Sequence, residues 1–171
     1  ILFHYTSLFR SVEGPNIIEE YVRKDNRIKH LTQPNQGQSV ARNNGLQLAK
    51  GKYIYFMDSD DILDTDVLKK CYNMCEKDEL DFVFFDATVI SSPNDSNTFA
   101  YCRKEIISED KLWNGIDLFN YELEHNIFIV SPCLCFTSHQ FLKSCFSGFP
   151  PGIIHEDRKS TRLNSSHQII S

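Results

Sequence analysis

The chain has 171 residues, of which 41% are hydrophobic and 24% charged, as in a soluble globular protein with room for one domain and a real core. Its net charge of −5 argues against nucleic-acid binding, which usually requires a concentrated basic face, and no apolar run approaches the roughly 20 residues that cross a bilayer. The six cysteines include no C-x-x-C pair, which argues against zinc, so we expect reduced thiols in a cytoplasmic protein.

The first half of the chain alternates between helical and strand patterns. Helices are indicated by apolar residues at helical spacing, and strands by short runs rich in β-branched and aromatic residues. In chain order we expect a helix at 16–24, a short strand at 28–32, a loop at 33–37, a helix from its N-cap Ser39 to a stop at Gly51, a strand at 52–57, a helix capped by Asp64, and a strand at 82–85.

This alternation predicts an α/β fold, with helices on both sides of a mostly parallel sheet. Further along the chain we expect a loop at 91–108, a helix at 115–125, a strand at 128–136 and a helix at 137–145. Residues 158–171 are polar, basic and aperiodic, so we leave them out of the fold, as a segment foreign to the protein or as a disordered tail.

The strand at 52–57 runs directly into the acidic turn Asp58-Ser59-Asp60. Ligands of open α/β sheets bind at the carboxyl ends of strands, and two carboxylates two residues apart can hold one Mg²⁺ or Mn²⁺. A simple helix cap is the competing interpretation. A calcium loop is excluded because Leu63 and Lys69 stand where that loop needs Gly and Glu. A haloacid-dehalogenase-type phosphatase also places D-x-D after a strand, and it remains an alternative.

Longer strings around this turn resemble a known family. The segments 35–45 (NQGQSVARNNG) and 49–61 (AKGKYIYFMDSDD) are similar to the pattern of the family 2 glycosyltransferases of the GT-A fold, N-x-G-x-S-x-A-R-N-x-G followed by A-x-G-x-Y-I-x-F-x-D-S-D-D. The segment 149–157 (FPPGIIHED) resembles the family's F-x-x-G-I-x-H-E-D. The resemblance covers about residues 15–157.

The resemblance implies inverting transfer of a sugar from a nucleotide-diphosphate donor, often UDP-linked, to a glycan or lipid-linked acceptor hydroxyl in cell-surface polysaccharide synthesis. It also implies a cytoplasmic location with peripheral association at the inner face of the membrane. Asp58 would bind the donor and the metal, and Asp60 would ligate the metal. Asp157 would be the general base, supported by Glu156. The resemblance assigns Arg42 and Asn43 to donor binding, and Arg42 could instead pair with an aspartate of the acidic turn.

Two parts of the family pattern have no counterpart in this sequence. These are the first strand, S-V-I-I-P-x-Y-N, and the acidic turn V-D-D-G-S, which together form much of the nucleotide pocket. We therefore expect a poorly matching leader at 1–14, a partial glycosyltransferase domain at 15–157 without its first strand, and a chain that is inactive by itself. A non-catalytic module that binds sugar nucleotides or glycans is the alternative from a different functional class.

Overall fold

The computed structural model describes residues 14–58, 61–87, 103, 106–108, 111–129 and 131–152, and the backbone of residues 168–170. None of the helices in this part of the chain is long and apolar enough to cross a membrane. In chain order the elements are α1 (Gly14–Lys24), α2 (Gln38–Leu48), β1 (Tyr53–Tyr55), α3 (Val67–Asp78), β2 (Phe82–Phe84), β3 (Leu112–Asn114), α4 (Gly115–Glu124), the 3-10 helix η1 (Pro132–Leu134), β4 (Cys135–Ser138), α5 (His139–Cys145) and β5 (Gln168–Ile170).

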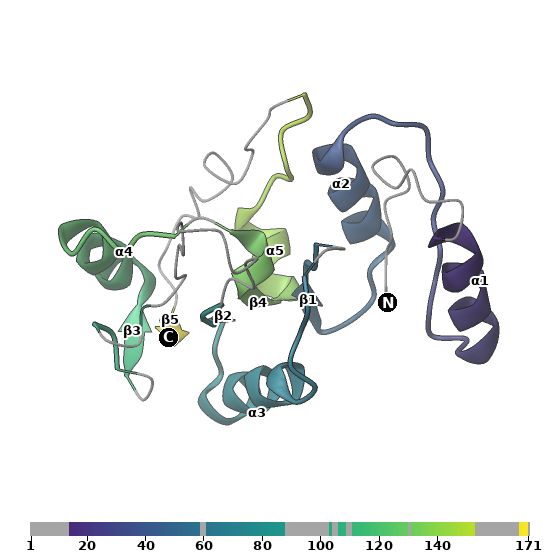
Figure 1. Cartoon of the computed structure of the whole chain (residues 1–171). Helices are drawn as coiled ribbons and strands as arrows, with labels where there is room; N and C mark the ends of the chain where they lie inside the picture. The colour runs from purple at the N-terminus through teal and green to yellow at the C-terminus, as the bar shows by residue number, and fades with distance from the viewer. Residues whose placement is uncertain are drawn as a thin grey trace, which may run out of the picture.

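The sheet runs in the order β1-β4-β2-β5-β3 (Figure 1). Strand β4 lies between β1 and β2 and is antiparallel to both, with Ile54 and Phe82 both opposite Thr137. The pair β2–β5 is parallel, whereas β3–β5 is antiparallel. The predicted α/β class is confirmed, but the prediction of a mostly parallel sheet is wrong for the described strands. A continuous apolar run indicates burial on both faces, and it says nothing about the direction of the neighbouring strand.

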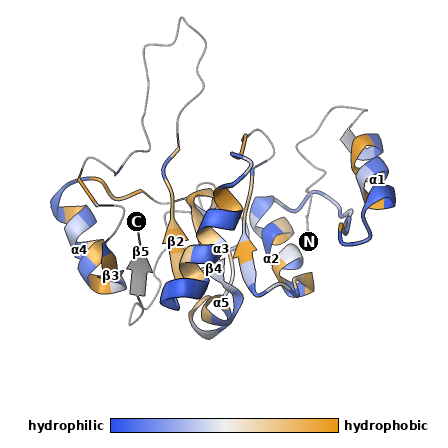
Figure 2. Cartoon of the chain, turned by 90° about the horizontal axis from the view of Figure 1, so that it is seen from below, coloured by the Kyte–Doolittle hydropathy of each residue, from blue (hydrophilic) through white to orange (hydrophobic). Residues whose placement is uncertain are grey.

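Burial on both faces of the sheet is visible in β2 itself. Val83 belongs to a core cluster with Cys71 and Cys75 of α3, whereas its neighbour Phe82 belongs to a second cluster with Phe141 of α5. Successive side chains of a strand point to opposite faces, so one strand supplies both cores. Figure 2 shows the hydrophobic colouring that runs along β2. The sheet is therefore a middle layer, and its strand ends are where polar side chains can gather.

The helices predicted at 16–24, 115–125 and 137–145 are confirmed as α1, α4 and α5. Helix α5 begins at the N-cap Ser138, whose Oγ accepts a hydrogen bond from the backbone N–H of Phe141 at 3.4 Å. Helix α1 contributes no buried residue, and Ile17 and Tyr21 on its apolar stripe are about half exposed.

Several boundaries differ from the sequence expectations. Helix α2 is capped by Gly37 at φ 89°, so Ser39 lies buried inside the first turn instead of capping it. Only glycine adopts such a φ without strain, which favours the earlier start. The residue before α3 is Asp66 instead of Asp64. Residues 28–32 form no strand, and the strand expected at 128–136 begins only at Cys135, after the 3-10 turn at Pro132.

Two strands were missed. Strand β3 directly precedes α4, and β5 lies in the tail that the sequence analysis left out of the fold. Each has three residues, which is too short for a periodic pattern to stand out. The expected loop at 91–108 falls mostly outside the described residues, as does the leader up to residue 13.

Candidate functional site

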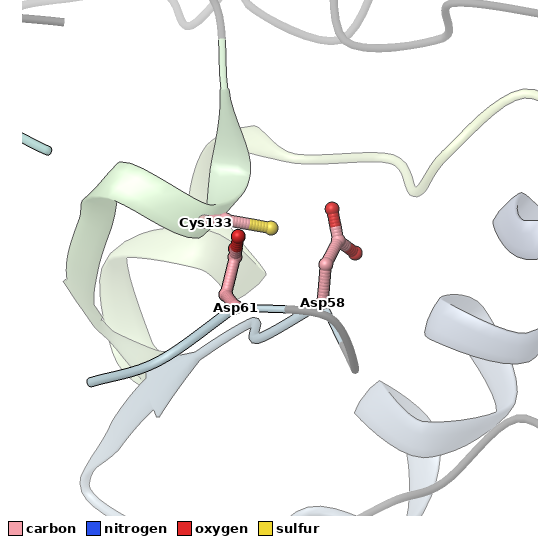
Figure 3. Close-up of side chains that lie close together, drawn as sticks. All are labelled: Asp58, Asp61 and Cys133. Atoms are coloured by element: carbon pink, nitrogen blue, oxygen red, sulfur yellow. The ribbon is translucent and has the colours of Figure 1, made fainter. Parts of the chain in front are cut away.

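The acidic turn after β1 lies beside a buried thiol. Asp58 follows the strand by three residues, and the backbone N–H of Asp61 donates to the carbonyl oxygen of Asp58 at 3.2 Å, which closes the turn. Ligand atoms of Asp58, Asp61 and Cys133 all lie within 4.8 Å of one another. Figure 3 shows the two carboxylates rising from the turn beside the Cys133 sulfur, which η1 contributes. Two segments distant in the sequence thus place three groups that can ligate a metal around one point.

Helix α2 holds one of these carboxylates. Gln38 Nε2 donates to Asp58 Oδ1 at 2.9 Å, and Arg42 Nη2 donates to the same oxygen at 3.1 Å. The two donors are four residues apart and therefore lie on one face of the helix. The Arg42 side chain is 10% exposed and that of Asp58 is 39% exposed. The pair is thus open to solvent on the carboxylate side, where a ligand would approach.

Burial and nearby charges keep the Cys133 thiol and the Tyr55 hydroxyl beside this site protonated. Burial, reinforced by the Asp58 carboxylate, raises the pKa of the Cys133 thiol to about 12. Burial also raises the pKa of the Tyr55 hydroxyl to about 12, and its neighbours Cys133, Asp61 and Asp58 add to the effect. At neutral pH both groups are therefore neutral, and the carboxylates supply the negative charge of the site.

The five described cysteines are free thiols, in agreement with the sequence expectation; they are Cys71, Cys75, Cys133, Cys135 and Cys145. Cys133 is distinguished from the other four by the two aspartates beside it.

Asn43, the residue after Arg42, makes a different kind of contact. Its Nδ2 donates to the carbonyl oxygen of Phe149 at 2.8 Å, and its Oδ1 accepts from the backbone N–H of the same residue at 2.8 Å. The segment after α5 is therefore fastened to α2. Asn43 was predicted to bind the donor, and that role stays a prediction, but both ends of its amide are engaged with the backbone of Phe149.

The structure brings Asp58 and Arg42 together, whereas the neighbouring Asn43 side chain bonds Phe149. The Arg42–Asp58 pair is the arginine–aspartate contact that the sequence analysis considered. Asp60, Glu156 and Asp157 lie outside the described residues, so their predicted roles as metal ligand, supporting acid and general base remain predictions.

Three neighbours of the site were not predicted: Gln38, Asp61 and Cys133. Asp61 belongs to the quoted D-S-D-D string, and Gln38 precedes Arg42 by one helical turn, so both had a local signal. Cys133 had none, because only the pairing of β4 with β1 brings η1 to the turn. Trp113 is 8% exposed and packs in the core beside Tyr121.

Named relatives match part of this chain. The glycosyltransferase EpsH of Bacillus subtilis (strain 168) is 42% identical over 70 residues, which are 41% of this chain and 20% of EpsH. The poly(ribitol-phosphate) beta-N-acetylglucosaminyltransferase TarP of Staphylococcus aureus (strain N315) is 35% identical over 71 residues, which are 42% of this chain and 21% of TarP. The matched part thus spans about a fifth of the length of these relatives.

The fold is shared with solved structures of a longer chain. The crystal structure of residues 1–349 of S. aureus TarS superposes with a TM-score of 0.69 at 17% identity, covering 99% of this chain and 50% of the chain in that structure. A second structure of the same TarS residues, in complex with UDP-GlcNAc, superposes with a TM-score of 0.68 at 17% identity, covering 98% of this chain and 48% of that one. At this identity the likeness shows the fold, and it confirms the GT-A-type α/β fold expected from the sequence.

The family is shown by a match over most of the chain. A model of the family described as Glycosyl transferase family 2 matches residues 13–146. That range contains the acidic turn, α2 and η1, and hence all three residues of the Asp58–Asp61–Cys133 cluster. The chain therefore belongs to glycosyltransferase family 2.

Proposed function

We propose that this chain carries the donor half of an inverting glycosyltransferase, which transfers a sugar from a UDP-linked donor to an acceptor hydroxyl in polysaccharide synthesis. The observation that carries the proposal is the convergence of Asp58, Asp61 and Cys133 at the end of β1, with Asp58 held by Arg42. Support comes from the family match and from relatives that include the glycosyltransferase TarP. A TarS structure with the same fold is a complex with UDP-GlcNAc, which makes that nucleotide sugar the first donor to test.

The chemistry of the ligand set fits a divalent cation. Carboxylate oxygens suit Mg²⁺ and Mn²⁺, and ligand atoms within 4.8 Å of one another can reach one ion. Asp58 and Asp61 would hold the metal, together with the predicted ligand Asp60. When bound, the metal supplies positive charge to the departing diphosphate. The Cys133 thiol is protonated at neutral pH, so the carboxylates are the ligands that would hold the ion.

Other side chains of the chain would orient the acidic turn and remove the acceptor's proton. Arg42 orients the Asp58 carboxylate and adds a positive charge on the side of α2, so that the turn keeps its shape before the donor binds. We assign proton removal from the acceptor hydroxyl to Asp157, because direct inversion needs one base on the face opposite the leaving group. Glu156 supports that base.

Because the 171-residue chain lacks the family's first strand and V-D-D-G-S turn and is expected to be inactive by itself, the tests use the chain with these segments restored at its N-terminus. The first test is calorimetric titration with UDP, with and without Mn²⁺. We expect UDP affinity to depend on the metal and to fall by more than about tenfold in Asp58→Asn and Asp61→Asn. Asp66→Asn is a matched control, because Asp66 is an exposed aspartate that pairs with Lys70 on α3. Metal-independent binding, or equal losses in all three variants, would overturn the proposal.

A second measurement separates catalysis from binding. In Asp157→Asn we expect UDP affinity to be retained and the release of UDP from UDP-GlcNAc to fall by at least about 100-fold, since a general base contributes that much. Binding of a glycan without metal, together with no release of UDP by the unsubstituted protein, would instead favour the non-catalytic binding module.

A further inference from the structure

The Arg42 side chain is held on one side by a carboxylate and on another by an aromatic ring. Its Nη2 donates to Asp58 Oδ1 at 3.1 Å, and its guanidinium carbon lies 5.2 Å from the centroid of the Phe149 ring. The quadrupole of a ring attracts a cation over its face, most strongly where water is excluded. Water is largely excluded here, since the Arg42 side chain is 10% exposed and Phe149 is 3% exposed. Because a phenyl ring offers no lone pair, it holds the guanidinium without competing with Asp58 for N–H groups.

The Phe149 ring is itself fixed in place. It packs edge-on against Phe146 and against Phe56, with the centroids 5.0 Å and 5.1 Å apart. Its backbone is fastened as well, because its N–H donates to Asn43 Oδ1 and its carbonyl oxygen accepts from Asn43 Nδ2, each at 2.8 Å. Asn43 follows Arg42 in α2, so one helix fixes the backbone of Phe149 and supplies the cation that its ring faces. Figure 1 shows the chain after α5 rising toward α2.

The residue before Phe149 permits this close approach to α2. Gly148 has φ +105°, a conformation that other residues rarely adopt. A Cβ at this position would lie 3.0 Å from Asn43 Oδ1, which is closer than ordinary contacts allow. Glycine is therefore required here twice, once for the backbone angle and once for the contact with Asn43. The sequence thus specifies the position of the Phe149 backbone on both sides of the contact.

Phe149 reaches the acidic turn by two routes. Phe56 lies two residues before Asp58 on the segment that leads from β1 into the turn, and Arg42 bonds the Asp58 carboxylate itself. One buried ring therefore contacts both the segment that carries the carboxylate and the cation that orients it. The Asp58 side chain is 39% exposed, so without an oriented Arg42 it would gain rotamer freedom that a metal and a donor would have to remove on binding.

We propose that Phe149 is a positioning residue of the donor site, whose ring holds Arg42 against Asp58 before the metal and the nucleotide bind. The inference rests on the proposed function, in which Asp58 binds the donor and the metal. It adds to that function a requirement for an electron-rich ring at position 149, which an apolar side chain without a ring does not meet.

The sharpest test changes the electron density of the ring and keeps its shape. In the chain with its N-terminal segments restored, Phe149 is replaced by phenylalanines with increasing numbers of ring fluorines, which withdraw the electron density that attracts a cation. We expect UDP affinity in Mn²⁺ to fall stepwise, by about 5- to 20-fold for the fully fluorinated ring. The matched control is the same series at Phe141, which is also 3% exposed and stacks on Phe82. There UDP affinity should change by less than about twofold.

A double-mutant cycle measures whether the ring acts through the arginine. Phe149→Leu keeps an apolar side chain and removes the ring, and we expect it to weaken UDP binding in Mn²⁺ by about 5- to 20-fold. In an Arg42→Gln background the same substitution should weaken binding by less than about twofold, because no cation remains for the ring to hold. Phe141→Leu should lower the free energy of unfolding by a similar amount and leave UDP affinity within about twofold.

Equal UDP affinity across the fluorinated series at position 149 would overturn the inference, and the proposed function would stand, because metal-dependent UDP binding is measured in the unsubstituted chain. The inference also fails if Phe149→Leu weakens binding equally with and without Arg42, or if the losses of affinity at positions 149 and 141 both follow the loss of unfolding free energy. If the unsubstituted chain does not bind UDP with Mn²⁺, the proposed function fails first, and the positioning role fails with it.

Discussion

Two arginine–carboxylate pairs in this molecule have the same chemistry and opposite surroundings. Arg103 Nε lies 2.8 Å from Glu122 Oε1, and the two side chains are 3% and 2% exposed. Arg42 Nη2 lies 3.1 Å from Asp58 Oδ1, with exposures of 10% and 39%. The first pair joins the chain before β3 to α4, and the second joins α2 to the acidic turn. Both place a guanidinium over an aromatic ring, Phe84 in the first case.

The two pairs differ in how much it costs to remove or replace one of their contacts. The two buried side chains contact each other in place of water. Arg103 also forms an ion pair with Asp86, and its Nη2 donates a hydrogen bond to the carbonyl oxygen of Ile129 at 3.2 Å. Burial raises the pKa of the Glu122 carboxyl in spite of the arginine beside it. Loss of either partner leaves a polar group stranded in the core. The half-exposed pair keeps water on the carboxylate, so a metal or phosphate can replace part of its contacts at low cost.

The largest effect on stability is expected at the buried pair. Glu122→Ala leaves the Arg103 charge without its buried partner, and we expect it to lower the free energy of unfolding by about 3–5 kcal/mol. Urea titration followed by the fluorescence of Trp113, the single tryptophan, measures this. Glu124→Ala, an exposed carboxylate on the same helix, serves as the control. If Glu122→Ala lowered the free energy of unfolding by less than about 1 kcal/mol, the buried pair would contribute no more to stability than an exposed pair does.

A much smaller effect on stability is expected at the acidic turn. Asp58→Asn removes the charge from a pair that is open to solvent, and we expect the free energy of unfolding to change by about 1 kcal/mol or less. The same urea titration checks it, alongside the predicted loss of metal-dependent UDP binding. A destabilisation as large as that of Glu122→Ala would show that Arg42 depends on Asp58 as a structural partner.

The smallest effect on stability is expected at an exposed carboxylate of α3, Glu76. Hydrogen bonds from Lys52 and then from Tyr53 lower the pKa of Glu76 below its usual value of 4.5. A folded-state pKa that is depressed contributes stability above pH 4.5, and this contribution is lost as the pH falls through the lowered pKa. Thermal unfolding midpoints should therefore differ between the unsubstituted protein and Glu76→Gln near neutral pH and converge in acid. A gap that widens in acid would contradict this assignment.

Local patterns in the sequence predicted the elements well. The apolar stripes of α1, α3 and α4 and the short runs of β1 and β2 are properties of neighbouring residues, and they were placed to within a few positions. The acidic turn and its arginine were found in the same way. Helix starts were less accurate at α2, because the positive φ of Gly37 decides the boundary and cannot be seen in the residue letters.

Non-local arrangements were not predictable from one sequence. The direction of β4 depends on pairing across distant parts of the chain, and the letters of its run, Cys135–Ser138, do not record that direction. Cys133 reaches the acidic turn only through that pairing. Asn43 was found as part of a motif, but its bond partner stands far along the chain, at Phe149. The site could therefore be located from the sequence, whereas the connections that hold it could not.

The insertion of β4 between β1 and β2 also has a consequence for biosynthesis. A ribosome releases β1, α3 and β2 in that order, yet in the described sheet β1 pairs only with β4, which is made last of these four elements. During translation the backbone groups of β1 that face β4 must stay bound to water or to a chaperone, and the apolar face of α3 has only part of its sheet to cover. Completion of the acidic turn, with the Cys133 thiol beside it, is thus a late event in the life of each newly made chain.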